Sequence, residues 1–212
     1  MAQKQFSLLQ KLQKNVPATW LASLKKQADA FYKLWDKYKQ VGQFVDVETG
    51  EICIGGSTAG AIVPAGLALA SQTYGEKKYL HAAEGLAEKF YTDYVLKGYT
   101  TGGPGEILST PDSESAFGLF ESYVTLYEVT GKKKWLEYAK DLLPICASWV
   151  VSYDFRFPEH SIMHQIDAHS TGSVWASVAN KHSAPAICTW WGESLWKYDR
   201  ATGDKYAIEL LK

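Results

Sequence analysis

The segment Asp112-Ser113-Glu114-Ser115 brings two carboxylates and two hydroxyls together at the start of a predicted helix. Carboxyl groups donate and accept protons, so the segment is a candidate for general acid/base chemistry. Capping is the ordinary alternative, because Asp or Ser before a helix binds free backbone N–H groups and an acidic first turn suits the helix dipole. One cap needs only one of these four side chains. Residues two apart do not share a helix face, so Asp112 and Glu114 are not expected to act as a facing pair.

The preceding loop contains the glycine-rich run Gly102-Gly103-Pro104-Gly105-Glu106. A phosphate-binding loop would require a preceding strand and a following Lys-Ser or Lys-Thr, and both are missing. Nucleotide binding is therefore not predicted. A tight turn at Gly103 that lets a ligand approach the backbone and an ordinary loop turn both remain open. Glu106 is a secondary candidate for carboxylate chemistry on this loop.

Four of the five histidines lie between residues 153 and 183. His160, His164 and His169 are spaced by four and five residues, with Asp167 between the last two, but no HExxH-type motif is present. We therefore predict no metal site. His182 stands just before the next predicted inner helix, where it could bind a carboxylate or hydroxyl or act as acid or base. A plain surface histidine is the alternative there.

A short boundary between two predicted helices occurs three times in the chain, and we call it a seam. Gly75, Gly131 and Gly203 each follow one predicted helix and precede a charged segment with an aromatic residue, and a glycine suits the left-handed residue that ends a helix. Glu121 and Glu193 hold the same offset before the second and third of these glycines. A buried carboxyl must be hydrogen-bonded or shift its pKa, and we favour structural pairing with a neighbouring inner helix over catalysis for both.

The separations of 56 and 72 residues between the seams predict stacked helical hairpins joined by long loops. The helix at 58–74 is apolar nearly all round, whereas 76–96 is apolar on one side, which indicates an inner and an outer layer. Long loops in such an array collect on one face, which locates the functional site. The expected helices are a short one within 1–14, then 17–39, 58–74, 76–96, 113–130, 132–152 and 184–201, with a hairpin or extended loop at 43–52 and long loops at 40–57, 97–112 and 153–183.

Composition excludes several classes of function. The net charge of −1 gives no basic surface for nucleic acid or anionic membranes, and the uncharged stretch 52–75 has no apolar run long enough to span a bilayer. Cys53, Cys146 and Cys188 lack CxxC spacing and are interpreted as small buried side chains. No signal segment follows Met1, so both a cytoplasmic and an exported location stay open.

Paired helices in two layers, with short turns on one side and long polar loops on the other, resemble the (α/α)6 toroid of the six-hairpin glycosidases. The segments 99–106 and 112–117, and the stretch 149–154 followed by 180–185, are similar to a bacterial glycoside-hydrolase-like branch of that superfamily. The resemblance covers nearly the whole chain as architecture and about a quarter of it by motif. A complete toroid has six hairpins, whereas this sequence supplies three pairs and an opening helix.

The resemblance implies a carbohydrate-active enzyme, most simply a glycoside hydrolase that uses carboxylates at the mouth where the inner helices begin, without a cofactor or metal. One of the consecutive Trp190 and Trp191 should be core, and the other could stack on a pyranose ring. The implied catalytic residues are Asp112 as acid/base with Glu114 and His182, and the implied substrate-binding residues are Gly103, Glu106, Ser113 and Trp191.

Two alternatives remain open. A sugar epimerase or polysaccharide lyase could use the same architecture, since both abstract a proton next to a carbonyl or carboxylate. A helical-repeat scaffold that binds a peptide or protein on its concave face would need no catalytic residue.

We also expect residues 1–212 to form one toroid-like domain that continues beyond Lys212, because the last hairpin is cut short there. The apolar helix at 184–201 would then be left without its next neighbour. The expectation that follows is self-association through the C-terminal hairpin, or poor solubility.

Overall fold

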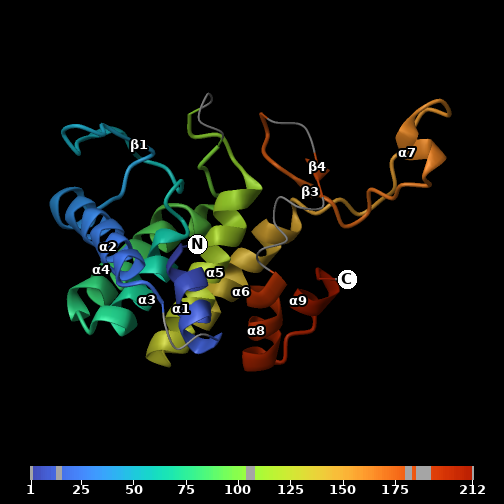
Figure 1. Cartoon of the computed structure of the whole chain (residues 1–212). Helices are drawn as coiled ribbons and strands as arrows, with labels where there is room; N and C mark the ends of the chain where they lie inside the picture. Colours follow the sequence, from blue (N-terminus) through green and yellow to red (C-terminus); the bar gives the residue numbers. More distant parts are fainter. Residues whose placement is uncertain (1, 13–15, 104–107, 180–182, 185–191, 212) are drawn as a thin grey trace.

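The computed structural model describes residues 2–12, 16–103, 108–179, 183–184 and 192–211. They form an all-α array with two small two-stranded sheets in its loops (Figure 1). The helices are α1 (Ala2–Leu12), α2 (Ala18–Tyr38), α3 (Val63–Tyr74), α4 (Lys77–Asp93), the 3-10 helix η1 (Val95–Lys97), α5 (Ser113–Thr130), α6 (Lys134–Ala147), α7 (Ile162–Gln165), α8 (Gly192–Thr202) and α9 (Tyr206–Glu209). The strands are β1 (Phe44–Val45) with β2 (Ile52–Ile54), and β3 (Val174–Trp175) with β4 (Ser183–Ala184), each pair antiparallel.

The helices form two layers, as the sequence predicts. In the inner layer α3 packs against α1 and α5, and α5 packs against α8. In the outer layer α2 packs against α4, while α4 and α6 each cover the inner helix that precedes them. Helix α2, the predicted opening helix, is joined to the shorter α1 before it. The Gln3 side-chain amide of α1 donates to the Leu24 carbonyl of α2 at 2.9 Å. Helices α1 and α2 therefore make a further inner–outer pair that precedes the three predicted ones.

Helix α5 is the centre of the core. Thirteen of its eighteen residues are buried, including Phe120, Tyr123 and the carboxylate-bearing Glu121. Helix α6 lays one apolar side on it, and the Tyr123 ring stacks on Trp135 with ring centroids 6.3 Å apart. A helix buried on all sides must be lined by neighbours on all sides, so α5 is the element on which the other inner helices depend.

The glycine seams are confirmed. Gly75, Gly131 and Gly203 all have positive φ, at 69°, 68° and 77°. Each donates its N–H to the carbonyl four residues earlier, which closes the last turn of α3, α5 and α8. These turns lie on the face opposite the long loops (Figure 1).

Several predicted helix bounds are wrong at one end. Helix α3 begins at Val63 rather than at residue 58, because Thr58 bonds the loop at Thr101 instead of a helical partner. Helix α6 ends at Ala147 rather than at 152, since Val150 and Val151 pair with the strand segment near Val174. The predicted helix at 184–201 is described only as α8, with Ser183–Ala184 in a strand and 185–191 outside the described residues. Helix 76–96 is divided into α4 and η1, whereas 113–130 is α5 as predicted.

The cysteine interpretation is right for one residue and wrong for another. Cys146 is buried in α6, but Cys53 is exposed in β2, where alternate residues of a two-stranded hairpin have nothing to cover them. Cys188 lies outside the described residues. Among the helices that the structure describes, none is both long enough and apolar enough to cross a bilayer.

Candidate functional site

The loops that precede α3, α5 and α8 lie on one face of the array, at the top of Figure 1. Helix α7 and the β3–β4 hairpin belong to the last of these loops, and β1–β2 belongs to the first. The loop before α5 contacts the other two loops near the first residue of α5. This convergence makes the start of α5 the candidate site, as the sequence predicts for a repeat array.

Asp112 is the N-cap of α5 and also joins it to the preceding loop. Its Oδ2 accepts a hydrogen bond from the Ser115 backbone N–H at 3.0 Å, and its Oδ1 accepts one from the Gly102 N–H at 2.9 Å. The residue is 6% exposed. Burial raises the pKa of Asp112 above its usual 3.8, although hydrogen bonds from Ser115 and from the backbone of Gly102 and Gly103 act in the opposite direction. Asp112 thus caps the helix, as the alternative interpretation expects. A catalytic role for Asp112 stays a prediction.

The loop before α5 is bonded to the loop before α3 at two residues. Thr58 donates its N–H to the Thr101 carbonyl at 2.5 Å, and its hydroxyl oxygen accepts the Thr101 N–H at 2.8 Å. The Gln43 side-chain amide, from the edge of the β1–β2 hairpin, donates to the Gly102 carbonyl at 3.2 Å. The loop before α5 is therefore held by two residues of the loop before α3, each more than forty residues away in sequence.

The loop before α8 reaches the same point. Ser113 donates its backbone N–H and its hydroxyl to the Ala176 carbonyl, at 3.0 and 3.1 Å. Val178 donates its N–H to the Pro111 carbonyl at 3.1 Å, and Asp112 and Ser177 form an isolated antiparallel bridge. Ser113 was predicted to bind substrate, but its hydroxyl is occupied in joining these two loops. Its substrate role remains a prediction.

Gly102 is required by the close approach of α5. A Cβ at this position would lie 2.1 Å from the Ser115 Oγ and 3.1 Å from the Ala59 Cα. Gly103 has a φ of 35°, in the region that disfavours other residues. The loop backbone at Gly102 thus lies against the helix, whereas the turn expected after Gly103 runs into residues outside the described ones.

Glu114 is the exposed carboxylate of the segment. It lies in the first turn of α5 and is exposed, unlike Asp112, Ser113 and Ser115 beside it. Partial burial raises the pKa of Glu114 above its usual 4.5, and the nearby charge of Asp112 raises it further. A carboxyl group that keeps its proton to higher pH and is accessible can act as a general acid.

The structure does not describe the other predicted site residues. Glu106, His182 and Trp191 lie outside the described residues, as does Trp190. Their proposed contacts with substrate therefore stay predictions. Of the seven predicted site residues, the structure places Gly103, Asp112, Ser113 and Glu114 together at the start of α5.

The histidine-rich loop is organised by a carboxylate rather than by a metal arrangement. Asp154 Oδ1 accepts hydrogen bonds from the N–H groups of Ser170 and Thr171, and its Oδ2 lies 2.9 Å from His169 Nδ1. These bonds lower the pKa of Asp154, that with His169 being the largest cause, and raise the pKa of His169 above 6.5. Within the described residues, no three His, Cys, Asp or Glu side chains are grouped as metal ligands.

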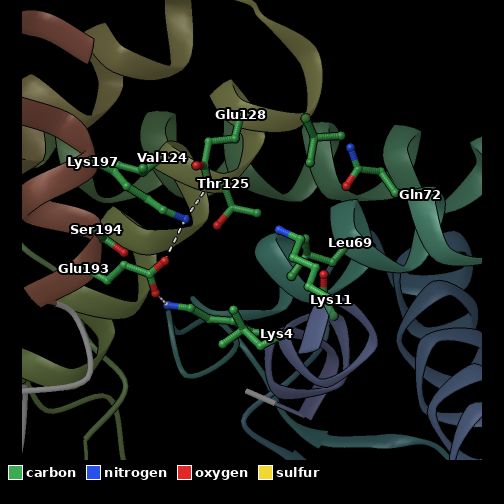
Figure 2. A pocket seen from close by; sticks show the side chains of 13 residues that line it. Lys4, Lys11, Leu69, Gln72, Val124, Thr125, Glu128, Glu193, Ser194 and Lys197 are labelled. Atoms are coloured by element: carbon green, nitrogen blue, oxygen red, sulfur yellow. Dashed lines mark hydrogen bonds and ion pairs between the residues drawn. The ribbon is translucent and has the colours of Figure 1, made fainter. Parts of the chain in front are cut away.

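A second polar region lies between the inner helices, where the predicted pairing of Glu121 and Glu193 can be examined. The Lys4 ammonium from α1 lies 3.0 Å from Glu121 Oε1 and 2.9 Å from Glu193 Oε2. Lys197 in turn lies 2.9 Å from both Glu193 and Glu128 (Figure 2). The repeat-equivalent glutamates are thus joined through one lysine of the first inner helix.

The sequence did not single out Lys4. Burial alone would lower the pKa of Lys4, but the hydrogen bond to Glu193 and the charge of Glu121 raise it above 10.5. No local pattern marks a lysine for a partner more than one hundred residues away. The available signal is that a buried glutamate on an inner helix requires a cation from another element, which holds for Glu121. Glu193 is exposed rather than buried, because it lies in the first turn of α8.

Two solved structures are similar to this chain. One is a glycoside hydrolase family 76 α-mannanase of Bacteroides thetaiotaomicron, with a TM-score of 0.52 and 14% identity over 88% of this chain and 53% of that one. The other is a family 76 glycoside hydrolase (mannosidase) from the same bacterium, with a TM-score of 0.51 and 14% identity over 91% and 51%. No protein-family model and no curated protein matches the sequence.

The structural likeness assigns the chain an all-α, toroid-like fold of the kind found in glycosidases. The chain spans about half the length of the two structures that it matches. At this level of identity the likeness defines the fold, whereas activity has to be argued from the site.

Proposed function

We propose that this protein is a glycoside hydrolase that acts on an oligo- or polysaccharide through Glu114 as its proton donor. The observation that carries the proposal is an accessible carboxyl with a raised pKa at the start of the central inner helix. It stands on the loop face of a fold shared with two glycoside hydrolases. Glycoside hydrolysis requires such a group to protonate the leaving oxygen.

Asp112 takes a different role in this proposal. Both of its oxygens accept backbone hydrogen bonds, so they are not free to attack a sugar or activate water. Its negative charge, however, helps to keep the proton on Glu114. We therefore assign Asp112 as a positioning residue that holds the loop on α5 and tunes the acid.

Hydrolysis also needs a second carboxylate, about 5–5.5 Å away for a retaining reaction or about 6.5–9.5 Å away for an inverting one. Glu106, on the loop that Asp112 anchors, is our first candidate for that group. His182 and Trp191, which precede α8 in the sequence, remain proposed sugar contacts. No cofactor or metal is needed for this chemistry.

The test is turnover of a panel of neutral and uronic-acid glycosides. The panel includes α-mannosides, because the two similar structures are those of a mannanase and a mannosidase. We expect new reducing ends with the wild-type protein and a loss of at least about 100-fold in kcat for Glu114→Gln, the usual range for a general acid. Glu48→Gln changes an exposed carboxylate on another loop and should keep full activity.

The products distinguish the alternatives. An ultraviolet-absorbing double bond would indicate a lyase, and exchange of a sugar hydrogen with water without cleavage would indicate an epimerase. Unchanged turnover in Glu114→Gln would remove Glu114 from the mechanism. Binding of a peptide or protein with no sugar affinity would favour the scaffold.

A further inference from the structure

A polar pocket of about 290 Å³ lies between the inner helices, and side chains of α1, α3, α5 and α8 line it (Figure 2). One of them is Thr125 of α5, which stands eleven residues after Glu114 on the same helix. A helix rises about 1.5 Å per residue, so the two residues lie roughly 16 Å apart along its axis. The pocket is therefore separate from the candidate catalytic site at the start of α5.

Thr125 offers a free hydroxyl to this pocket. Three other helical threonines, Thr73, Thr130 and Thr202, each donate their hydroxyl to the carbonyl four residues earlier. Thr125 is only 8% exposed, yet within the described part of the chain its hydroxyl has no hydrogen-bond partner. Its side chain points into the pocket (Figure 2). A hydroxyl that does not bond its own helix is available to a ligand there.

Lys11 of α1 and Gln72 of α3 line the pocket beyond Thr125 (Figure 2). Among the residues that the structure describes, neither of these two side chains has an ion-pair or hydrogen-bond partner. Lys11 supplies donors only, whereas the Gln72 amide and the Thr125 hydroxyl both donate and accept. The pocket thus presents unused donors and acceptors from three different helices.

The charged side chains at the pocket balance one another. Together with the ion pairs beside the pocket they are three lysines and three glutamates: Lys4, Lys11, Lys197, Glu121, Glu128 and Glu193. A charged ligand would bring a further charge without a counterion into this partly buried group, whereas a neutral ligand would keep the balance. The charge balance therefore favours a neutral ligand.

The rest of the wall is partly apolar, and the pocket is small. Leu69 of α3 and Val124 and Val129 of α5 contribute hydrocarbon to it. Its volume lies at the lower end of the roughly 300–1,000 Å³ that is usual for small-molecule sites. A matching ligand is small, carries hydroxyl groups that both donate and accept, and has a C–H surface for the aliphatic side chains. One monosaccharide ring combines these properties.

We propose that this pocket binds one neutral monosaccharide, at a site separate from the carboxyls at the start of α5. Sugar hydroxyls accept hydrogen bonds from Lys11 and Gln72 and donate to Thr125 and to the Glu128 carboxylate. The Lys197 ammonium, 2.9 Å from Glu128, holds that carboxylate in place. Binding here requires no bond cleavage, so it is tested independently of the hydrolase activity proposed above.

The test is calorimetric titration of the 212-residue protein with glucose, mannose and galactose, beside the uronate and 2-amino forms of the same sugars. At least one neutral sugar should bind. Its two charged forms should each bind more weakly by about tenfold or more at pH 7, because each adds an unbalanced charge. Methyl NMR locates the site: the resonances of Leu69, Val124 and Val129 should shift on titration, whereas that of Val178 on the loop face should not.

Two pocket variants test the assigned contacts. Thr125→Val should weaken binding of the neutral sugar by about threefold or more, because one hydrogen bond is lost. Lys11→Met removes a balancing positive charge, so the ratio of amino-sugar affinity to neutral-sugar affinity should rise by about tenfold or more. The matched controls are Thr92→Val, since Thr92 is exposed and bonds its own helix, and Lys26→Met at an exposed position of α2. Both controls should keep the wild-type affinities, and circular dichroism should show that all four variants keep their helix content.

A wild-type protein that binds none of the neutral sugars, or that binds a charged form at least as well, would overturn the proposal. Shifts confined to Val178 and its neighbours would also overturn it, because the sugar would then lie on the loop face. An affinity ratio that does not change in Lys11→Met would contradict the charge balance on which the choice of a neutral ligand rests.

Discussion

Lys4 and Glu121 form an ion pair of 3.0 Å between the first helix of the chain and the buried centre of α5. Glu121 is 2% exposed, and its second carboxylate oxygen is buried without a hydrogen-bond partner. The ion pair thus gives one carboxylate oxygen of the buried Glu121 a partner. It also ties α1 to a helix that it does not adjoin in sequence.

The first prediction follows from this pair. Lys4→Met should lower the free energy of unfolding by about 3 kcal/mol, because it leaves the Glu121 carboxylate buried without its cation. Adding Glu121→Gln should restore part of the loss, since the neutral amide no longer requires a partner charge. Urea unfolding measures both. Lys26→Met, at an exposed position of α2, should change stability by no more than about 0.5 kcal/mol.

The second prediction concerns the fit of the α5 loop. Gly102→Ala should lower the free energy of unfolding by about 1–3 kcal/mol, because the new Cβ overlaps the Ser115 Oγ and crowds Ala59. Gly66→Ala in α3 is the matched control, with no atom within 4 Å of the added Cβ. It should stabilise the protein by up to about 1 kcal/mol through helix propensity. Equal effects of the two substitutions would contradict the close approach.

The third prediction is the protonation of Glu114. Carbon-13 NMR should show its carboxyl titrating above 4.5, and Asp112→Asn should bring that pKa down by removing the neighbouring charge. A raised carboxyl pKa contributes stability that is fully present below pH 4.5 and is lost as the pH rises through the pKa of Glu114. Any hydrolase activity should lose its protonated acid over the same range. A Glu114 pKa unchanged by Asp112→Asn would contradict the coupling.

The fourth prediction concerns the histidine-rich loop between α6 and α8. His169 should titrate above 6.5 in proton NMR, because Asp154 favours its charged form, and Asp154→Asn should return it to about 6.5. The raised pKa contributes stability that is fully present below pH 6.5 and is lost as the pH rises through the His169 pKa. A His169 pKa that does not change in Asp154→Asn would contradict the contact.

Much of the array could be predicted because its signals are local. The left-handed glycines Gly75, Gly131 and Gly203 and the polar cap at Asp112 depend on residues within one or two turns. The all-round burial of α5 and the one-sided burial of α4 follow from periodicity along each helix. These features gave the layers, the short turns and the face that carries the long loops.

Helix ends were less predictable where long-range bonds compete with the helix. Thr58 is held by Thr101, and Val151 by Ser173, so both leave the helical path that their neighbours' periodicity favours. A strand or loop partner far along the chain satisfies the same backbone groups as a helical turn. The residues near Thr58 and Val151 in sequence do not indicate these distant partners.

The sequence by itself determined which residues repeat, which helices are buried and where polar residues gather. Only the tertiary structure decided that both Asp112 oxygens accept hydrogen bonds from backbone N–H groups and that Glu114 is the accessible carboxylate. It also decided that Lys4 forms ion pairs with both Glu121 and Glu193. Periodicity and capping act within a few residues, whereas ion pairs and loop contacts form between segments that chain folding brings together. Their partners are therefore fixed by the packing of whole helices and not by neighbours in sequence.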